Sequence, residues 1–242
     1  MKTKPPEATG VTRRKRLAVE PLLALLRQIE SAGDYDAVFH GSKIKPPKPL
    51  TRMRLNDVLD WQKQSVDAGS FSSASGAYQF IRATLSATIR ELGVDPARKW
   101  SPALQDEMAI HLLEGRGLTR FLRSEITTDD FMMQLSREWA AIPRPDTGRS
   151  YYDDDGVNSA QVSVDEAKEV LSGVRRTYRS ELPPEPKARR GPAAAAGAAG
   201  VAALGAMASS GGLVAGAGEV WAGGLLVALV AGLVALFFWR VS

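Results

Sequence analysis

Glu30 is the residue whose type and position are best suited to chemistry. Four apolar residues precede it at helical spacing: Leu22, Leu25, Leu26 and Ile29. We therefore expect a helix over about residues 20–31, with Glu30 in its last turn on the same face as Leu26. Apolar neighbours and the negative end of the helix dipole both disfavour a carboxylate charge and raise its pKa. A carboxyl group protonated near neutral pH suits the general acid of glycosidic bond cleavage, although a helix-terminal Glu is also a common surface residue.

Two further carboxyl groups follow Glu30 closely. Asp34 and Asp36 lie four and six residues after it, beyond a helix stop expected at Gly33. If either faces the same groove as Glu30, it could position a water molecule, and the reaction would then be a hydrolysis. The alternative is that both are turn residues at the helix exit. Spacing alone leaves both possibilities open.

The elements that must position these residues are mostly helical. The segment 37–53 contains three prolines and is expected to be irregular or a small β-hairpin, and the Gly/Ser-rich segment 69–76 is expected to be a loop. Apolar periodicity and capping signals predict helices at 56–66, from Tyr78 or Ala83 to 93, from Ser101 to 115, from Thr128 to 143, and from Ser163 onward. The predicted fold class is mainly α, an α+β domain with at most a small β-hairpin.

The composition changes sharply along the 242 residues. The segment 220–239 carries no charge and is long enough to span a bilayer core of ~30 Å. The tail is expected to form either one transmembrane helix or a helical hairpin that turns at Glu219. We divide the chain into a disordered basic arm (1–17), a globular domain (18–182), a Pro-rich and basic linker (183–192) and an apolar membrane segment (193–242).

Composition also excludes several classes of protein. There is no cysteine, so disulfides and thiolate chemistry are excluded. The only histidines, His40 and His111, are far apart, and we expect neither a metal site nor a cofactor. The basic runs at 13–16 and 187–190 flank the domain, and no nucleic-acid recognition motif is present, so no nucleic-acid partner is expected. The first residues lack the apolar core of a cleavable signal peptide.

Six sequence blocks between about residues 18 and 175 resemble the lytic transglycosylases and the phage lambda endolysin family of lysozyme-like muramidases. Each block is weak alone, and their order and spacing make the resemblance fairly specific. The blocks are IESAGDYDAV at 29–38, SGAYQFI at 75–81, SPALQD at 101–106, LEGRG at 113–117, EWAAIP at 138–143 and GRSYY at 148–152.

The resemblance implies a lysozyme-like fold and cleavage of the bond between N-acetylmuramic acid and N-acetylglucosamine in peptidoglycan. Glu30 would be the catalytic residue, serving first as acid and then as the base that closes a 1,6-anhydro ring, so that no second carboxylate is needed. The resemblance also implies a set of substrate-binding residues: Tyr78, Gln79, Gln105, Trp139 and Tyr151. For Trp139 the helical spacing favours the alternative, a core position on an amphipathic helix.

Two alternatives remain at this point. One is a hydrolytic lysozyme on the same fold, and the other is a peptidoglycan-binding membrane protein without activity. In each case the tail would place the protein at the bacterial inner membrane, with the lipid bilayer as a second partner beside peptidoglycan.

Overall fold

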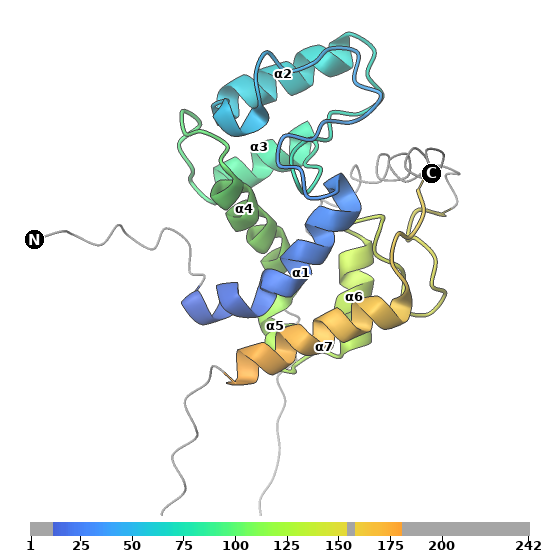
Figure 1. The fold of residues 1–242 in the computed structure, drawn as a ribbon. Helices are drawn as coiled ribbons and strands as arrows, with labels where there is room; N and C mark the ends of the chain where they lie inside the picture. The colour runs from blue at the N-terminus through green and yellow to red at the C-terminus, as the bar shows by residue number, and fades with distance from the viewer. Residues whose placement is uncertain (1–11, 154–157, 181–242) are drawn as a thin grey trace, which may run out of the picture.

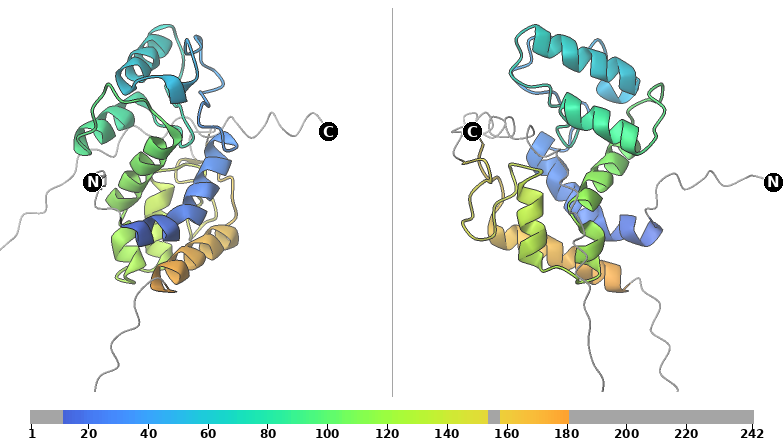
Figure 2. Two further views of the ribbon diagram at one scale, coloured as in Figure 1. Left: turned by 60° about the vertical axis from the view of Figure 1, so that its left-hand side comes forward. Right: turned by 180° about the vertical axis from the view of Figure 1, so that it is seen from behind.

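The computed structural model describes residues 12–153 and 158–180, and these residues are mainly helical. Helices α2 and α3 lie at one end of the molecule, and α5, α6 and α7 lie at the other (Figure 1). Helices α1 and α4 run between these two groups, as the other views confirm (Figure 2). The end of α1 that carries Glu30 therefore lies where the two groups meet.

Helix α1 spans Arg13–Ser31, which makes it longer than the sequence pattern predicts. The Thr12 side chain caps it by accepting a hydrogen bond from the Lys15 amide, so the helix begins before the apolar stripe does. Residues 13–17, which we assigned to a disordered arm, are thus helical, and the remainder of that arm lies outside the described residues. Because the helix starts early, Pro21 lies inside it rather than in its first turn, where proline is usually found. The helix ends where Ala32 adopts a left-handed conformation, one residue before the predicted stop.

The first group contains the 3-10 helix η1 (Leu50–Arg52), α2 (Leu55–Asp67) and α3 (Arg82–Glu91). The segment 37–53 forms no β-hairpin in the described structure, because its extended residues pair only through isolated bridges such as Val38 with Ser75. Its course is irregular, as its prolines favour. Tyr78 lies in a turn before α3, so the later of the two predicted starts for this helix is the correct one.

Helix α4 and the second group follow the predicted caps. Ser101 caps α4 (Pro102–Gly115), and Thr127 forms a reciprocal capping box with Asp130 at α6 (Thr128–Ser136). Ser163 accepts a hydrogen bond from the Glu166 amide at the start of α7 (Val164–Ser180). Two expectations were wrong here. Helix α6 ends at Ser136 rather than continuing to Pro143, and the short helix α5 (Leu118–Leu122) was not predicted.

One apolar core joins the two groups. The largest fully buried side chains include Trp100, Phe121 and Phe131, and the two phenylalanine rings stack with centroids 4.5 Å apart. Helix α7 packs along α1, which brings the last described helix against the first. No helix in residues 12–153 and 158–180 is long and apolar enough to cross a membrane. The membrane segment expected at 193–242 and the linker at 183–192 lie outside the described residues.

Candidate active site

The carboxyl group of Glu30 is buried, with 4% of the residue exposed. Within the described part of the chain its Oε1 atom has no hydrogen-bond partner. Burial without a compensating charge raises the pKa of Glu30 to about 8. The group is therefore mostly protonated at neutral pH, and no residue that the structure describes holds its Oε1 atom in a hydrogen bond.

Glu30 lines a pocket between the two groups of helices. The loop 74–81 and the start of α3 form one wall, and residues 138–140, just after α6, form another. Of the expected substrate-binding residues, Tyr78, Gln79 and Trp139 lie in this pocket with Glu30. Trp139 is only 4% exposed and also belongs to the apolar core, so it packs against the core as well as lining the pocket.

The turn that carries Tyr78 and Gln79 depends on a tightly packed glycine. Gly76 has a φ of 75°, and a Cβ placed there would lie 2.6 Å from Oε1 of Gln105 and 2.7 Å from the Trp100 ring. Only glycine fits both the conformation and the space. Gln79 itself has a φ of 51°, which is uncommon for a residue other than glycine. Its side-chain nitrogen Nε2 donates to the Gly76 carbonyl at 2.9 Å.

Gln105 holds this turn from behind. Its Oε1 accepts from the Ala77 amide at 2.8 Å, and its Nε2 donates to the carbonyls of Tyr35 and Trp100. The residue is fully buried and does not line the pocket. The structure thus places Gln105 under the Tyr-Gln turn, where it supports the turn rather than facing the groove.

Ser31 links the end of α1 that carries Glu30 to the same turn. Its hydroxyl lies 3.0 Å from the carbonyl oxygens of both Arg27 and Ala77, and it can donate to either. Because Ser31 and Ala77 directly adjoin Glu30 and Tyr78 in sequence, this contact sets the two pocket-lining segments against each other.

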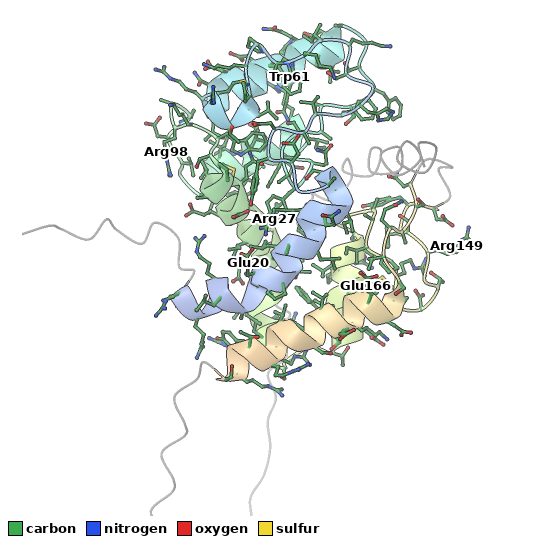
Figure 3. The ribbon with its side chains drawn as sticks, in the orientation of Figure 1. Glu20, Arg27, Trp61, Arg98, Arg149 and Glu166 are labelled. Carbon is green, nitrogen blue, oxygen red and sulfur yellow. The ribbon has the colours of Figure 1, made fainter. Side chains whose placement is uncertain are left out.

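Asp106 fixes the Tyr78 ring from α4. Its Oδ1 accepts from the hydroxyl of Tyr78 at 2.6 Å and from that of Tyr35 at 2.8 Å. Arg27, which projects from α1 (Figure 3), donates to the Tyr78 hydroxyl at 3.0 Å and forms an ion pair with Asp106 at 3.3 Å. Burial and the hydrogen bond to Asp106 raise the pKa of Tyr78, so it remains a neutral phenol.

The remaining predicted residues lie elsewhere. Asp34 accepts from the Asp36 amide at 2.8 Å, and Asp36 accepts from the amide and hydroxyl of Thr51. The Asp34 contact stabilises its own turn, whereas Asp36 binds the 3-10 helix η1, and neither side chain lines the Glu30 pocket. Tyr151 is 40% exposed, contacts Arg137 and also lies outside the pocket lining.

Glu138 lines the pocket, and the sequence did not single it out. It is 8% exposed, and its Oε2 accepts from Arg116 at 2.7 Å. Burial raises the pKa of Glu138, while the charge and hydrogen bond of Arg116 act against that rise. The only available signal was its position in the EWAAIP block beside Trp139.

The pocket thus combines a protonated carboxyl group, an ion-paired carboxyl group, a phenol ring, an amide and an indole. Acid catalysis on a polar, ring-shaped substrate is the chemistry that such a set can perform. Among the described residues, no cluster of three or more potential metal ligands is present. Fold and pocket together describe a mainly helical domain with a buried carboxyl group at a pocket, which is an arrangement typical of enzymes that use acid catalysis.

The endolysin family model matches residues 28–163, which is more than half of the chain. The chain belongs to the endolysin family, and it is accordingly a peptidoglycan-degrading endolysin. The match includes Glu30, the Tyr78–Gln79 turn and the 138–143 block. No match was found among curated proteins or among solved structures.

Proposed function

We propose that this endolysin cleaves the β-1,4 bond between N-acetylmuramic acid and N-acetylglucosamine by lytic transglycosylation, with Glu30 as the catalytic acid and base. The observation that carries the proposal is the buried Glu30 carboxyl group, which faces a pocket and has no partner among the described residues. Its pKa of about 8 keeps the acid form available at neutral pH.

In this mechanism Glu30 donates its proton to the glycosidic oxygen, and the N-acetylglucosamine chain leaves. The C6 hydroxyl of the muramic residue then attacks its own C1 and gives its proton to the Glu30 carboxylate. A 1,6-anhydro ring closes, and Glu30 is protonated again for the next cycle. Tyr78, held by Asp106 and Arg27, and Trp139 supply rigid ring surfaces for the sugars, and Gln79 supplies an amide donor and acceptor.

A second candidate is hydrolysis, and Glu138 supports it. Asp34 and Asp36 were the residues we first considered for positioning water, yet one is engaged in its own turn and the other with Thr51, and both lie outside the pocket lining. Glu138 is the second carboxyl group that does line the pocket; burial raises its pKa, and the charge and hydrogen bond of Arg116 act against that rise. When ionised, Glu138 would supply the second carboxylate that hydrolytic glycosidases use to activate water.

Mass spectrometry of the released muropeptides tests both candidates. Transglycosylation yields 1,6-anhydro ends, which are lighter by one water molecule than the reducing ends that hydrolysis yields. We expect anhydro ends as the main product of the wild-type chain, and reducing ends throughout would contradict the transglycosylase proposal. If Glu138 directs water, Glu138→Gln lowers the share of reducing ends; Glu114→Gln, which changes an ion-paired carboxyl group outside this pocket, leaves it unchanged.

Glu30→Gln separates an enzyme from a protein that only binds the wall. Gln has nearly the same shape as Glu but has no titratable proton to give. We expect the loss of activity to exceed about a hundredfold in a turbidity assay on purified walls, with binding to those walls retained. Full activity in Glu30→Gln would mean that another group is the acid.

We further propose that the apolar segment 193–242 attaches the enzyme to the bacterial inner membrane. The support is its composition, above all the charge-free stretch 220–239. Carbonate extraction of membranes from cells that express the full chain tests this proposal. A chain that carbonate releases into the soluble fraction would contradict it.

A further inference from the structure

Six exposed arginines gather at the end of the molecule opposite Glu30, and we call this surface the basic end. It is formed by the first turn of α1, by α5 and its exit, and by the last turns of α7, which lie together in all three ribbon views (Figures 1 and 2). The six residues are Arg13, Arg16, Arg120, Arg123, Arg176 and Arg179.

Packing contacts between these helices hold the basic end together. The Arg14 guanidinium lies over the Tyr178 ring, 4.0 Å from its centroid, which joins α1 to α7. Lys15 donates to Thr119 at 2.9 Å, which joins α1 to α5. Arg175 donates to the carbonyls of Phe121 and Ile126, which joins α7 to α5 and the segment that follows it. The arginines therefore sit on a rigid surface rather than on a mobile segment.

The acidic residues near this surface are already engaged. Glu114 pairs with Lys15, and Asp130 caps α6 through Thr127. Asp129 pairs with Lys168 at 2.8 Å, and Glu125 lies 4.0 Å from Arg123. Burial and, after it, repulsion from Arg179 lower the pKa of Arg175, which is consistent with an excess of positive charge at the end of α7. An anionic partner would relieve this excess.

We propose that the basic end docks the catalytic domain on the surface of an anionic phospholipid bilayer. The charge of the exposed arginines complements phospholipid headgroups, and Leu17, which is 46% exposed in the first turns of α1, offers an apolar contact beside them. The sequence after the described residues also supports a bilayer as the partner. The chain leaves the domain after Ser180, at the basic end itself, and the following residues contain the basic run 187–190 and the apolar stretch 220–239.

Docking in this way would orient the active site. Glu30 lies seventeen residues after Arg13 on the same helix, so the two ends of α1 are at most about 25 Å apart along it. With Arg13 at the headgroups, the pocket faces away from the bilayer, toward the space where the wall lies. The proposal does not require Glu30 to be the catalytic acid, and it can be tested in the Glu30→Gln background.

Vesicle flotation with the full chain tests the proposal. One set of vesicles contains phosphatidylcholine alone, and in the other about a quarter of the lipid is phosphatidylglycerol. The apolar tail contributes to binding in both sets, so the readout is the ratio of binding to anionic and neutral vesicles. The test variant is the triple reversal Arg13→Glu, Arg16→Glu and Arg176→Glu, which changes only exposed side chains.

The matched control reverses three exposed cations at the other end of the molecule: Arg90, Arg98 and Lys99. Arg98 lies near α3, far from the end of α7 (Figure 3). Each reversal changes the charge by two, so both variants go from a net charge of +4 to −2. Circular dichroism melting of both variants verifies that they fold.

We expect the wild-type chain and the control to favour anionic vesicles, and the test variant to lose this preference by more than about tenfold. Raising the salt from about 0.1 M to about 0.5 M should abolish the preference of the wild type. An equal preference in both variants would overturn the proposal. So would a test variant that keeps its vesicle preference but loses binding to purified walls, since the basic end would then recognise a wall polymer.

Discussion

The hydroxyl of Ser31 lies 3.0 Å from the carbonyl oxygen of Ala77, and this contact connects the two segments that form the candidate active site. Glu30 precedes Ser31, and Tyr78 follows Ala77, so the acid and the ring surface are each one residue from the contact. This arrangement offers a physical reason for a serine directly after Glu30: through its contact with Ala77, Ser31 holds the turn that carries Tyr78 against the end of α1.

We expect Ser31→Ala to lower activity more than it lowers stability. Losing this hydrogen bond costs about 1 kcal/mol of unfolding free energy, and a small shift of Glu30 relative to Tyr78 would reduce kcat by roughly tenfold. Ser136→Ala is the control, because Ser136 is fully buried and its hydroxyl donates at 2.9 Å to the Met133 carbonyl within its own helix. Urea denaturation and turbidity assays on both variants check this. Equal losses of activity would show that Ser31 has no positioning role.

The activity of the wild-type enzyme should fall as the pH rises through about 8. Only the protonated Glu30 can donate a proton, and burial raises its pKa to that value. Above it, kcat should decrease roughly tenfold per pH unit. Initial rates on purified walls between pH 5 and pH 10 would show this limb, and wall binding by Glu30→Gln over the same range controls for changes in the substrate. A limb near pH 4.5, the ordinary value for Glu, would indicate a solvated carboxyl group.

Glu30→Gln should also stabilise the fold, and more so at higher pH. Below about pH 4.5 the carboxyl group is protonated in both the folded and the unfolded chain, so it imposes no pH-dependent penalty. Between about 4.5 and 8 the unfolded chain ionises while the folded chain does not, so the folded state loses stability as the pH rises, and the loss is complete above about 8. At pH 7 this penalty is on the order of 3 kcal/mol. Urea denaturation of both chains at pH 4.5 and pH 7.5 measures it, and a gain independent of pH would contradict the burial of a protonated Glu30.

Gly76→Ala should destabilise the protein much more than Gly69→Ala. Both glycines have a positive φ, 75° and 91°, so both substitutions cost about 1 kcal/mol in backbone strain. A Cβ at Gly69 meets nothing within 4 Å, whereas one at Gly76 collides with Gln105 and Trp100. We expect an additional loss of about 2 kcal/mol at Gly76, together with reduced activity, because the Tyr-Gln turn must move. Thermal melts of the two variants provide the comparison, and similar melting temperatures would show that the Gly76 site can relax.

The sequence predicted those features of the fold that depend on neighbouring residues, namely apolar helix faces and helix caps. The apolar stripe before Glu30 placed the acid at a helix end against the core, and the caps at Ser101, Thr127–Thr128 and Ser163 mark helix starts to within a residue. Helix α1 began earlier than expected because its first turns are polar. They are held by partners distant in sequence, such as Tyr178 and Glu114, which a periodicity pattern does not contain.

The candidate site was predictable only in part for the same reason. The sequence did not single out Glu138, because its position depends on where the preceding helix ends: α6 ends at Ser136, and the following turns direct Glu138 into the pocket. Gln105 was taken for a sugar ligand because a buried amide that supports a turn and an amide that binds a ligand have the same sequence signature. Only the three-dimensional arrangement of Gly76, Ala77 and Gln105 separates the two roles.

The packing of α7 along α1 affects when the enzyme can become competent during synthesis. The helix that carries the acid emerges from the ribosome first, and a main part of its support emerges about 150 residues later. A growing chain that stops short of Val164 would leave α1 without the helix that packs along it. Wall-degrading capacity would thus be withheld from unfinished chains, and a truncation ending at residue 163 should unfold at a lower urea concentration than the full chain and should not clear a suspension of walls.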